Sequence, residues 1–292
     1  MYNEQKIRKS EALQLILLDN LYAQSGSQHI IFQGGTALRW VYGGMRFSED
    51  LDFVTSLSAD DVDKILTKTL KRMGIACIAQ FGPGISEQKF KSRRKPSTQM
   101  LYVYRPDGQR ARIAVKLEFE GLKADHQPDF EKFVLRDLPS VTGIIRSGEL
   151  VLPYTSSIIV VETLEEILSD KIRALYERQY IKGRDIYDVW WLTKKLGISP
   201  QWPITQNKFE MYQAPFVAAR EADFFQKKKH VSNITAAIES DLTRFIPQNI
   251  YSLHRERNFG EFINTLKEVT SGLLNQGMRS FLKDHERRKS NT

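Results

Sequence analysis

The chain has 292 residues, of which 41% are hydrophobic, so it can bury a core and is not a disordered protein. Its formal net charge of +8 favours polyanionic partners. Its one cysteine, Cys77, has no intrachain disulfide partner, and neither a signal peptide nor a bilayer-spanning apolar run is visible, so we expect a cytoplasmic protein without a membrane partner.

Helical and strand-like patterns alternate through the first half of the chain. A helix is predicted over residues 8–24. Further segments follow at residues 29–33, 36–43, 49–54, 58–72, 75–81, 98–104, 111–119 and 149–152. The runs 75–81 and 98–104 are strand-like. Residues 83–97, between them, are rich in proline, glycine, serine and basic side chains, which predicts a basic loop.

The remainder of the chain is mostly helical in pattern. Residues 163–166 (Thr-Leu-Glu-Glu) have the form of a capping box, so a helix is predicted to begin there. Trp190 falls in helical register with Ile186, which favours a place in the core over base stacking. We therefore expect an α/β (α+β) fold. Residues 1–155 would form a domain with a mixed β-sheet flanked by helices, and residues 156–292 a mostly helical domain.

A glycine turn followed by paired aspartates is the strongest functional signal. Gly34, Gly35 and Thr36 follow an apolar strand and open a helical segment, where glycines let a ligand approach and free N–H groups can bind phosphate. Asp50 and Asp52 follow on the next strand and point to the same side. Their repulsion calls for a cation, and oxygen ligands suit Mg²⁺ or Mn²⁺ together with substrate phosphates. The stretch predicts a metal–triphosphate site, whereas a bare Asp-x-Asp is alternatively a solvated pair.

Lys171 and Asp185 also each have a structural and a functional interpretation. Lys171 lies at the edge of the apolar stripe of its predicted helix, so its ammonium either reaches solvent or points into a site. A triphosphate site built from two aspartates needs such a cation. Asp185 opens the next helix, where it complements the helix dipole and can also hold Lys171 in place. Arg184 and Asp188 are expected to be surface or structural ion-pair residues.

The motifs resemble a known family. Residues 34–38 (Gly-Gly-Thr-Ala-Leu) and 46–53 (Arg-Phe-Ser-Glu-Asp-Leu-Asp-Phe) resemble the first motif of nucleotidyltransferase toxins of the AbiEii and MenT type, in the DNA polymerase β-like nucleotidyltransferase superfamily. Residues 161–178 and 182–189 resemble the downstream motif, in which a helix lysine and a later aspartate complete the site. Beyond about residue 195 no motif is visible.

The resemblance implies a role for each matching residue. Seven residues would form the site: phosphate-binding Gly34, Gly35 and Thr36, metal-binding Asp50 and Asp52, and Lys171 and Asp185, which would project toward the aspartates across an interdomain cleft. Arg39 and Arg46 are further nucleotide-binding candidates, although Arg39 is equally an exposed helix residue. The superfamily also implies a third metal-binding carboxylate. Glu118 is the candidate, with a solvated strand face as the alternative.

The implied biology is that of a toxin in a bacterial toxin–antitoxin or abortive-infection system. It would transfer NMP from an NTP to an RNA acceptor, the tRNA 3′ end, and so block translation. A cognate antitoxin would be encoded nearby and would act with or without direct contact. Three basic runs, residues 89–95, 227–230 and 285–289, suit RNA because Lys and Arg contacts to phosphate supply affinity. Each run is alternatively a solvated loop or tail.

Two other functional classes stay open. One is a nucleotidyltransferase that modifies a protein or a small molecule, against which the basic runs argue. The other is a non-catalytic nucleotide- or RNA-binding protein of the same fold, against which the intact aspartates, glycine turn and Lys171 argue. A P-loop kinase is disfavoured because the chain has no Gly-x-x-x-x-Gly-Lys-Ser/Thr run.

Overall fold

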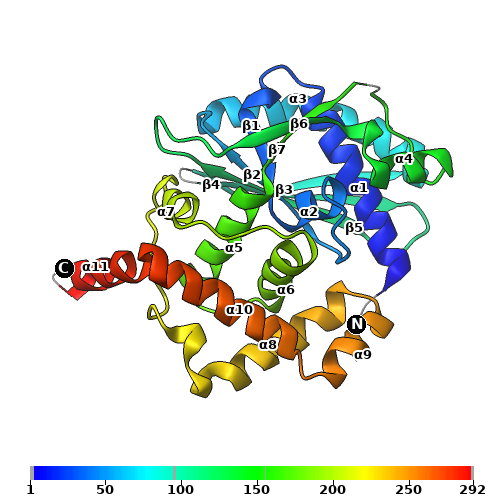
Figure 1. Ribbon diagram of the computed structural model, residues 1–292. Helices are drawn as coiled ribbons and strands as arrows, with labels where there is room; N and C mark the ends of the chain where they lie inside the picture. The colour runs from blue at the N-terminus through cyan, green and yellow to red at the C-terminus, as the bar shows by residue number, and fades with distance from the viewer. Residues whose placement is uncertain (1–2, 95–96, 155, 291–292) are drawn as a thin grey trace. The chain divides into compact units, whose positions relative to one another are not determined.

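The computed structural model describes residues 3–94, 97–154 and 156–290, which divide into two compact units. The first unit is Asn3–Glu162 and the second begins at Thr163. Strand β7 (Ile158–Glu162) ends the first unit, and helix α5 (Leu164–Glu177) begins the second one residue later. Figure 1 labels the elements of both units.

A mixed seven-stranded sheet forms the first unit (Figure 1), in the order β3-β4-β5-β2-β1-β7-β6. Its strands are β1 (Ile30–Gln33), β2 (Asp50–Thr55), β3 (Gly84–Arg94), β4 (Ser97–Pro106), β5 (Ile113–Gly121), β6 (Phe130–Val134) and β7. β2 is parallel to β5 and β1 to β7, whereas the other neighbouring pairs are antiparallel. The predicted α+β fold with a mixed sheet is confirmed.

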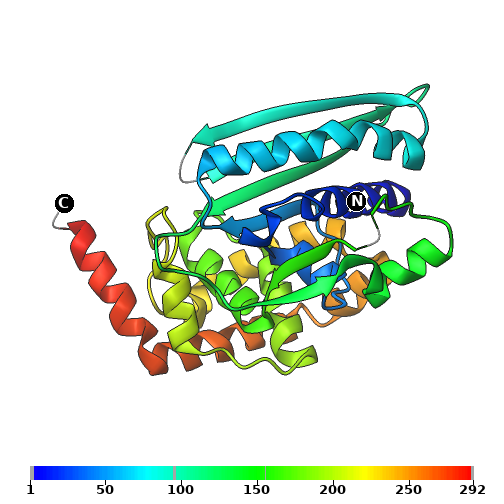
Figure 2. The ribbon, with the colours of Figure 1, turned by 90° about the horizontal axis from the view of Figure 1, so that it is seen from above.

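The helices of this unit are α1 (Glu4–Tyr22), α2 (Gly34–Trp40), α3 (Ala59–Phe81) and α4 (Pro139–Arg146), with short 3₁₀ turns η1 (Ser27–His29) and η2 (Leu135–Asp137). Of these, α1, α2 and α3 pack on the sheet, and α4 packs on η2. α1 packs against β5 and α3, and α3 lies along the β3–β4 hairpin (Figure 2). In the core, Phe53 of β2 stacks on Phe119 of β5 with ring centroids 4.8 Å apart. Because Asp50 and Asp52 alternate with Leu51 and Phe53, their carboxylates lie on the opposite face of the strand from this core.

Helix α3 is longer than the sequence pattern predicts. It runs unbroken from Ala59 to Phe81, so the strand-like interpretation of residues 75–81 is wrong. Met73, Ala76 and Cys77 are buried at helical spacing, while Ile75 and Ile78 are exposed. A short apolar run fits either element, and here the burial follows the helical period. Cys77 itself is a buried free thiol, as expected.

The basic loop predicted for residues 83–97 is also wrong. Gly84–Arg94 form β3, an edge strand that pairs with β4 and shifts register between Phe90 and Ser92. Charged residues are common on edge strands because they oppose pairing with another sheet edge, which accounts for the loop-like composition. Lys95 and Pro96 lie outside the described residues.

Residues 149–152, predicted as a further element, form no strand or helix. Instead the sheet contains β6 and β7, which the prediction missed. Both are five-residue strands at or near the edge of the sheet, a length at which periodicity is weak evidence.

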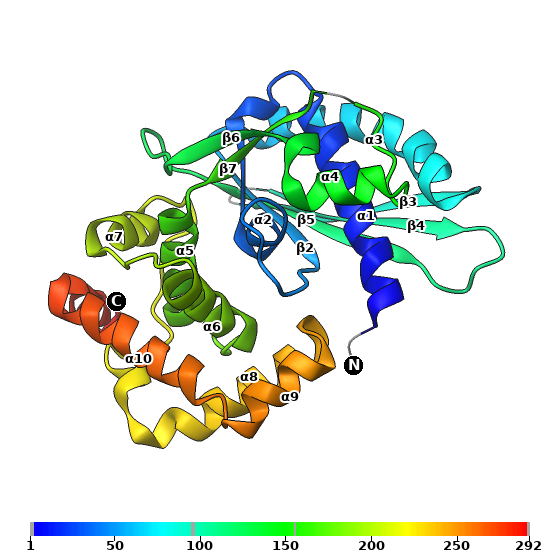
Figure 3. The same ribbon diagram turned by 45° about the vertical axis from the view of Figure 1, so that its right-hand side comes forward.

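Helices dominate the second unit (Figure 3). They are α5, α6 (Gly183–Trp190), α7 (Trp202–Glu210), α8 (Val231–Phe245), α9 (Gln248–Glu256), α10 (Gly260–Leu273) and α11 (Arg279–Ser290), with short turns η3 (Trp191–Lys195), η4 (Phe224–Gln226), η5 (Lys228–His230) and η6 (Leu274–Met278). α6 packs against α5, α8 and α10. Its buried Trp190 lies 4.9 Å from Phe262, between ring centroids, so the predicted core position is confirmed. In the described ranges no helix is both long and apolar enough to cross a bilayer.

Candidate active site

The Gly34-Gly35 turn joins β1 to α2 without an intervening loop residue. Gly34 has φ +79°, a left-handed value that favours glycine. A Cβ on Gly34 would stand 2.8 Å from Oδ2 of Asp52, and a Cβ on Gly35 would overlap the guanidinium of Arg46. The turn therefore requires glycine at both positions because a carboxylate and a guanidinium lie against its backbone.

Asp50 and Asp52 share one side of β2, and both are partly exposed. Antiparallel pairing places Asp52 opposite Gln33, the residue before the turn. Parallel pairing places Asp50 opposite Lys116 and Asp52 opposite Glu118. The aspartates, the glycine turn and the polar residues of β5 thus meet on one face of the sheet, although they come from three separate segments of the chain.

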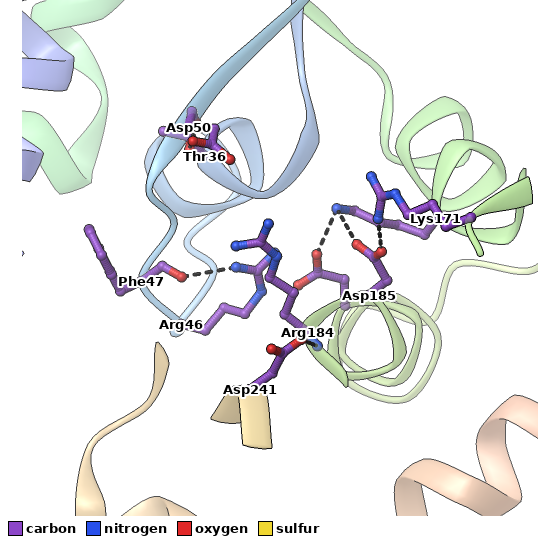
Figure 4. Close-up of polar contacts among 10 residues, drawn as sticks. Thr36, Arg46, Phe47, Asp50, Lys171, Arg184, Asp185 and Asp241 are labelled. Carbon is purple, nitrogen blue, oxygen red and sulfur yellow. Dashed lines mark hydrogen bonds and ion pairs between the residues drawn. The ribbon is translucent and has the colours of Figure 1, made fainter. Parts of the chain in front are cut away.

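Arg46 supplies buried positive charge at the turn. It is 4% exposed, and its Nη1 donates a hydrogen bond to the carbonyl of Phe47 at 2.9 Å (Figure 4). The next residue, Ser48, is fixed from α1 because Gln14 Nε2 donates to its carbonyl at 2.6 Å. A guanidinium held against Gly35 by its own loop is well placed to attract a phosphate bound at the turn.

Two other predicted nucleotide-binding residues have structural partners. The Thr36 side chain is buried, and its hydroxyl donates to the carbonyl of Asp50, which ties α2 to β2 (Figure 4). Arg39 Nε lies 2.8 Å from Glu11 Oε1, and Nη1 donates to the Gly44 carbonyl at 3.2 Å. These contacts account for both side chains without a nucleotide, so a direct role in nucleotide binding stays a prediction.

Glu118 is held by its neighbours on the sheet. Its Oε1 accepts a hydrogen bond from Gln99 Nε2 at 2.6 Å, and its Oε2 lies 2.5 Å from Lys116 Nζ. Burial lowers the pKa of Lys116, but Glu118, Asp50 and Asp52 raise it to a value above the ordinary one. Lys116 is therefore a charged counter-ion for three carboxylates on this face.

The residues on this face suit a metal site with two carboxylate ligands better than a site with three. In the part of the chain that the structure describes, no three His, Cys, Asp or Glu side chains are grouped to hold a metal ion. Gln99 and Lys116 engage both oxygens of Glu118, and its role as a third metal ligand stays a prediction. Asp50 and Asp52 alone suit Mg²⁺, which commonly binds through one or two carboxylates and completes its shell with substrate phosphates and water.

A second charged centre joins α5 to α6. Lys171 Nζ lies 3.2 Å from Asp185 Oδ1 (Figure 4) and 2.9 Å from Asp188 Oδ2. The other oxygen of Asp185 pairs with Arg178. Lys171 is 8% exposed and Asp185 3% exposed, so the pair is almost fully buried. Lys171 therefore points toward a carboxylate centre and not into solvent.

The charges around Asp185 favour an anion. Burial, the largest single effect, raises the pKa of this carboxyl, but the charges of Arg178, Lys171, Arg184 and Lys182 together lower it further than burial raises it. The net pKa lies below its ordinary value, so Asp185 is ionised at neutral pH. Four basic residues thus act on the carboxylate of Asp185, which shares Lys171 with Asp188.

Sequence reasoning missed part of this centre. Asp188 is buried, so a surface position is wrong, and the alternative expectation of a structural ion pair is correct. Its spacing of three residues from Asp185 on one helix was the available signal, since such residues share a face. Arg178 was not singled out. Arg184 donates its backbone N–H to Asp241 Oδ2 at 3.3 Å (Figure 4), which anchors α6 to α8.

The basic runs are placed only in part. In residues 227–230, Lys227 pairs with Glu221 at 2.6 Å and with Asp223 at 3.2 Å, whereas Lys228 and Lys229 are exposed. In residues 89–95, the side chains after Lys91 lie outside the described residues, and in residues 285–289 so do those after His285. Their predicted contacts with RNA stay predictions.

Comparison with known proteins gives a family match and two similar folds. Residues 16–270 match the family described as "Nucleotidyl transferase AbiEii toxin, Type IV TA system". The crystal structure of JHP933 from Helicobacter pylori is similar, with 17% identity, TM-score 0.56, and coverage of 95% of this chain and 97% of that one. So is a candidate nucleotidyltransferase from H. pylori, with 17% identity, TM-score 0.53, and coverage of 94% and 98%. No curated protein matches the chain.

Proposed function

We propose that this chain, which belongs to the AbiEii nucleotidyltransferase toxin family of type IV toxin–antitoxin systems, transfers a nucleoside monophosphate from an NTP to an RNA acceptor. The acceptor we propose is the 3′ end of tRNA. A tRNA extended or capped there would not be aminoacylated normally, so translation would stop. The reaction would take place in the cytoplasm, where both substrates are abundant.

One observation carries the proposal. The backbone of Gly34 lies against the carboxylate of Asp52, so near that a single added carbon would stand 2.8 Å from it. A triphosphate bound at the turn would thus be next to the carboxylates of Asp50 and Asp52, which are suited to Mg²⁺. Arg46, against Gly35, would add positive charge to the same phosphates.

The reaction would proceed by attack of an acceptor hydroxyl on the α-phosphorus of the NTP. The bond between the α-phosphorus and its bridging oxygen would break, and pyrophosphate would leave. Mg²⁺ (or Mn²⁺), when bound, would activate the hydroxyl and stabilise charge on the leaving group. Asp50 and Asp52 would hold the metal, while Glu118, engaged by Lys116 and Gln99, would keep Lys116 in place.

We further propose that the Lys171–Asp185 centre of the helical unit serves the same reaction. An ammonium is a compact point charge suited to phosphate, and Asp185 and Asp188 hold it from two sides, at 3.2 and 2.9 Å. During transfer the Lys171 ammonium would neutralise charge that develops on the triphosphate, and Asp185 would orient it.

The family implies an antitoxin partner. We propose that a neighbouring gene encodes this antitoxin and that it acts with or without direct contact with the toxin. Co-purification of the two proteins would support direct contact, whereas rescue of growth without co-purification would support indirect action.

A transfer assay tests the proposal. Purified protein, total tRNA, Mg²⁺ and each labelled NTP in turn are incubated and separated on a denaturing gel, with Asp52→Ala as the inactive variant. Asp60→Ala is the matched control, since it removes an exposed aspartate from α3 of the same unit. We expect label on tRNA with the wild type and Asp60→Ala, and none with Asp52→Ala or without Mg²⁺.

The alternative outcome is equally informative. If a folded protein that binds triphosphate labels no tRNA with any NTP, the tRNA proposal is wrong. Label on a protein or a small molecule in the same mixture would then identify a different acceptor class for the same chemistry.

A further inference from the structure

Tyr180 presents an aromatic ring to solvent on the segment between α5 and α6. Its exposed fraction is 65%, and the other exposed aromatic side chain in the described residues, Phe130, reaches only 37%. Most other aromatic rings of the helical unit are buried, as in the contact between Trp190 and Phe262. The Tyr180 side chain therefore adds little to the core and is largely accessible to a ligand.

The backbone beside Tyr180 is held in place by a buried arginine. Arg220 donates Nη1 to the carbonyl of Leu175 at 2.8 Å and also to that of Arg178. Its Nη2 donates to the carbonyl of Gln179 at 3.3 Å. Three carbonyls at the end of α5 are thus tied to one side chain. An exposed ring on a fixed segment loses little conformational freedom when a ligand binds, which favours binding.

Basic residues flank Tyr180 in the sequence, and one of them contacts its ring. Lys182 Nζ lies 5.8 Å from the centroid of the Tyr180 ring. Arg178, two residues before, pairs with Asp185 and so links this segment to the Lys171–Asp185 centre within the same unit. An exposed aromatic ring with a cation beside it suits single-stranded nucleic acid, because the ring can stack on a base while the cation attracts phosphate.

We propose that Tyr180, together with Lys182, is a stacking platform for a nucleobase. The proposal rests on the proposed function, since it assigns the platform to a substrate of that reaction. The base belongs either to the single-stranded 3′ end of the acceptor or to the incoming nucleotide. Both present the same flat π-face to the ring, so kinetics must separate them.

The first test compares Tyr180→Ala with the wild type in the transfer assay. Loss of one base stack should raise the KM of one substrate by roughly 5- to 150-fold, with kcat much less affected. Tyr180→Phe keeps the aromatic face and should stay within about twofold of the wild type. Phe130→Ala removes the other exposed aromatic ring and should change neither KM. Since Tyr180 is exposed, its truncation should leave the melting temperature unchanged.

The substrate affected identifies the base. A higher KM for tRNA at unchanged KM for NTP assigns the platform to the acceptor, and the reverse assigns it to the incoming nucleotide. Unchanged KM values for both substrates in a folded Tyr180→Ala protein overturn the proposal while the transfer reaction itself stands.

A binding measurement separates this proposal from the proposed function. Fluorescence anisotropy with a labelled single-stranded RNA that ends in CCA, and with a labelled NTP, requires no turnover and can use Asp52→Ala. Weaker binding of either probe to Asp52→Ala/Tyr180→Ala supports the platform even if the wild type transfers nothing to tRNA. Equal binding of both probes with and without Tyr180 rejects it.

Discussion

At the scale of single residues, Gly34 and Gly43 form a matched pair in the first unit. Both have left-handed φ, +79° and +76°, so alanine at either position should cost about 1–2 kcal/mol of stability. Only at Gly34 would the new Cβ meet a side chain, Oδ2 of Asp52 at 2.8 Å, whereas Gly43 has nothing within 4 Å. We expect Gly34→Ala to lower kcat for nucleotide transfer on the order of 100-fold by displacing that carboxylate, and Gly43→Ala to keep nearly full activity.

The measurement is kcat together with the melting temperature of both variants. Similar losses of melting temperature would show that both carry the same backbone strain. If the two variants then had equal kcat, contact between the turn and Asp52 would have no part in catalysis.

Cys77 allows a pH prediction at the same scale. Burial raises the pKa of its thiol to about 11, against a smaller lowering effect of the Tyr102 hydroxyl. Because the folded-state pKa is raised, the thiol contributes stability that is fully present below its ordinary pKa of 9.0 and is lost as pH rises toward 11. We expect iodoacetamide at pH 8 to leave Cys77 unmodified in the native protein and to modify it in urea, as mass spectrometry would report. Rapid modification without urea would contradict the burial of this thiol.

Sequence reasoning at this scale succeeded where the chemistry is local. Asp50 and Asp52 are two residues apart on one strand, so their common side follows from strand geometry alone. The partners of Glu118 could not be predicted in the same way. Lys116 lies two residues away, but Gln99 reaches Glu118 only through the register of β4 on β5, which no local pattern specifies. The role of Glu118 as a third metal ligand therefore stays a prediction.

At the scale of elements, a buried ion cluster joins α5 to α7. Lys208 is fully buried, with Nζ 3.0 Å from Glu166 Oε2 and 2.9 Å from Asp170 Oδ2. We expect Lys208→Met to lower the free energy of unfolding by about 3–5 kcal/mol, because it removes the cation that lies within 3.0 Å of the carboxylates of Glu166 and Asp170. Lys194→Met is the matched control, since Lys194 lies 2.6 Å from Glu268 but both side chains are about half exposed, and it should lower this free energy by less than about 1 kcal/mol.

Urea unfolding followed by circular dichroism measures both variants. Equal midpoints for Lys208→Met and the wild type would mean that the cluster adds no net stability to the α5–α7 pair. Lys171 lies on α5 together with Glu166 and Asp170. We therefore expect Lys208→Met, which would loosen α5, to lower transfer activity as well as stability.

The fold was predictable at the scale of elements where segments are long and periodic. The start of α5 followed from the Thr-Leu-Glu-Glu pattern, although the Thr163 side chain makes no capping hydrogen bond, and the buried register of Trp190 followed from helical spacing. Short segments were not predictable. Residues 75–81 have an apolar composition that suits a strand, yet they continue α3 because its buried face extends to Cys77. The sequence of residues 84–94 resembles a loop because edge strands often carry charged side chains. Only the pairing with β4 shows that these residues form a strand.

At the scale of the whole molecule, the proposed function requires that two charged centres, one in each unit, act on the same transition state. Groups that act as a unit show strongly non-additive losses, because removing one already removes what the others contribute. We therefore expect Asp52→Asn and Lys171→Arg each to lower the single-turnover rate of nucleotide transfer. The rate of the double variant should be about equal to the rate of the less active single variant. Lys171→Arg retains the charge between Asp185 and Asp188 but replaces a point charge with a planar fork, so the helical unit should stay folded.

Single-turnover rates of the four proteins, measured with their melting temperatures, decide between two accounts of the helical unit. If the losses multiply, the centres act on separate steps, and the Lys171–Asp185 centre contributes to a stage such as acceptor binding. If Lys171→Arg transfers nucleotide at the wild-type rate while Asp52→Asn does not, the point charge of Lys171 has no special role in transfer, which would favour a structural role for the buried pair. Losses that fail to multiply would tie both units to a single reaction, and would explain why a family defined by nucleotidyl transfer matches this chain from α1 through α10.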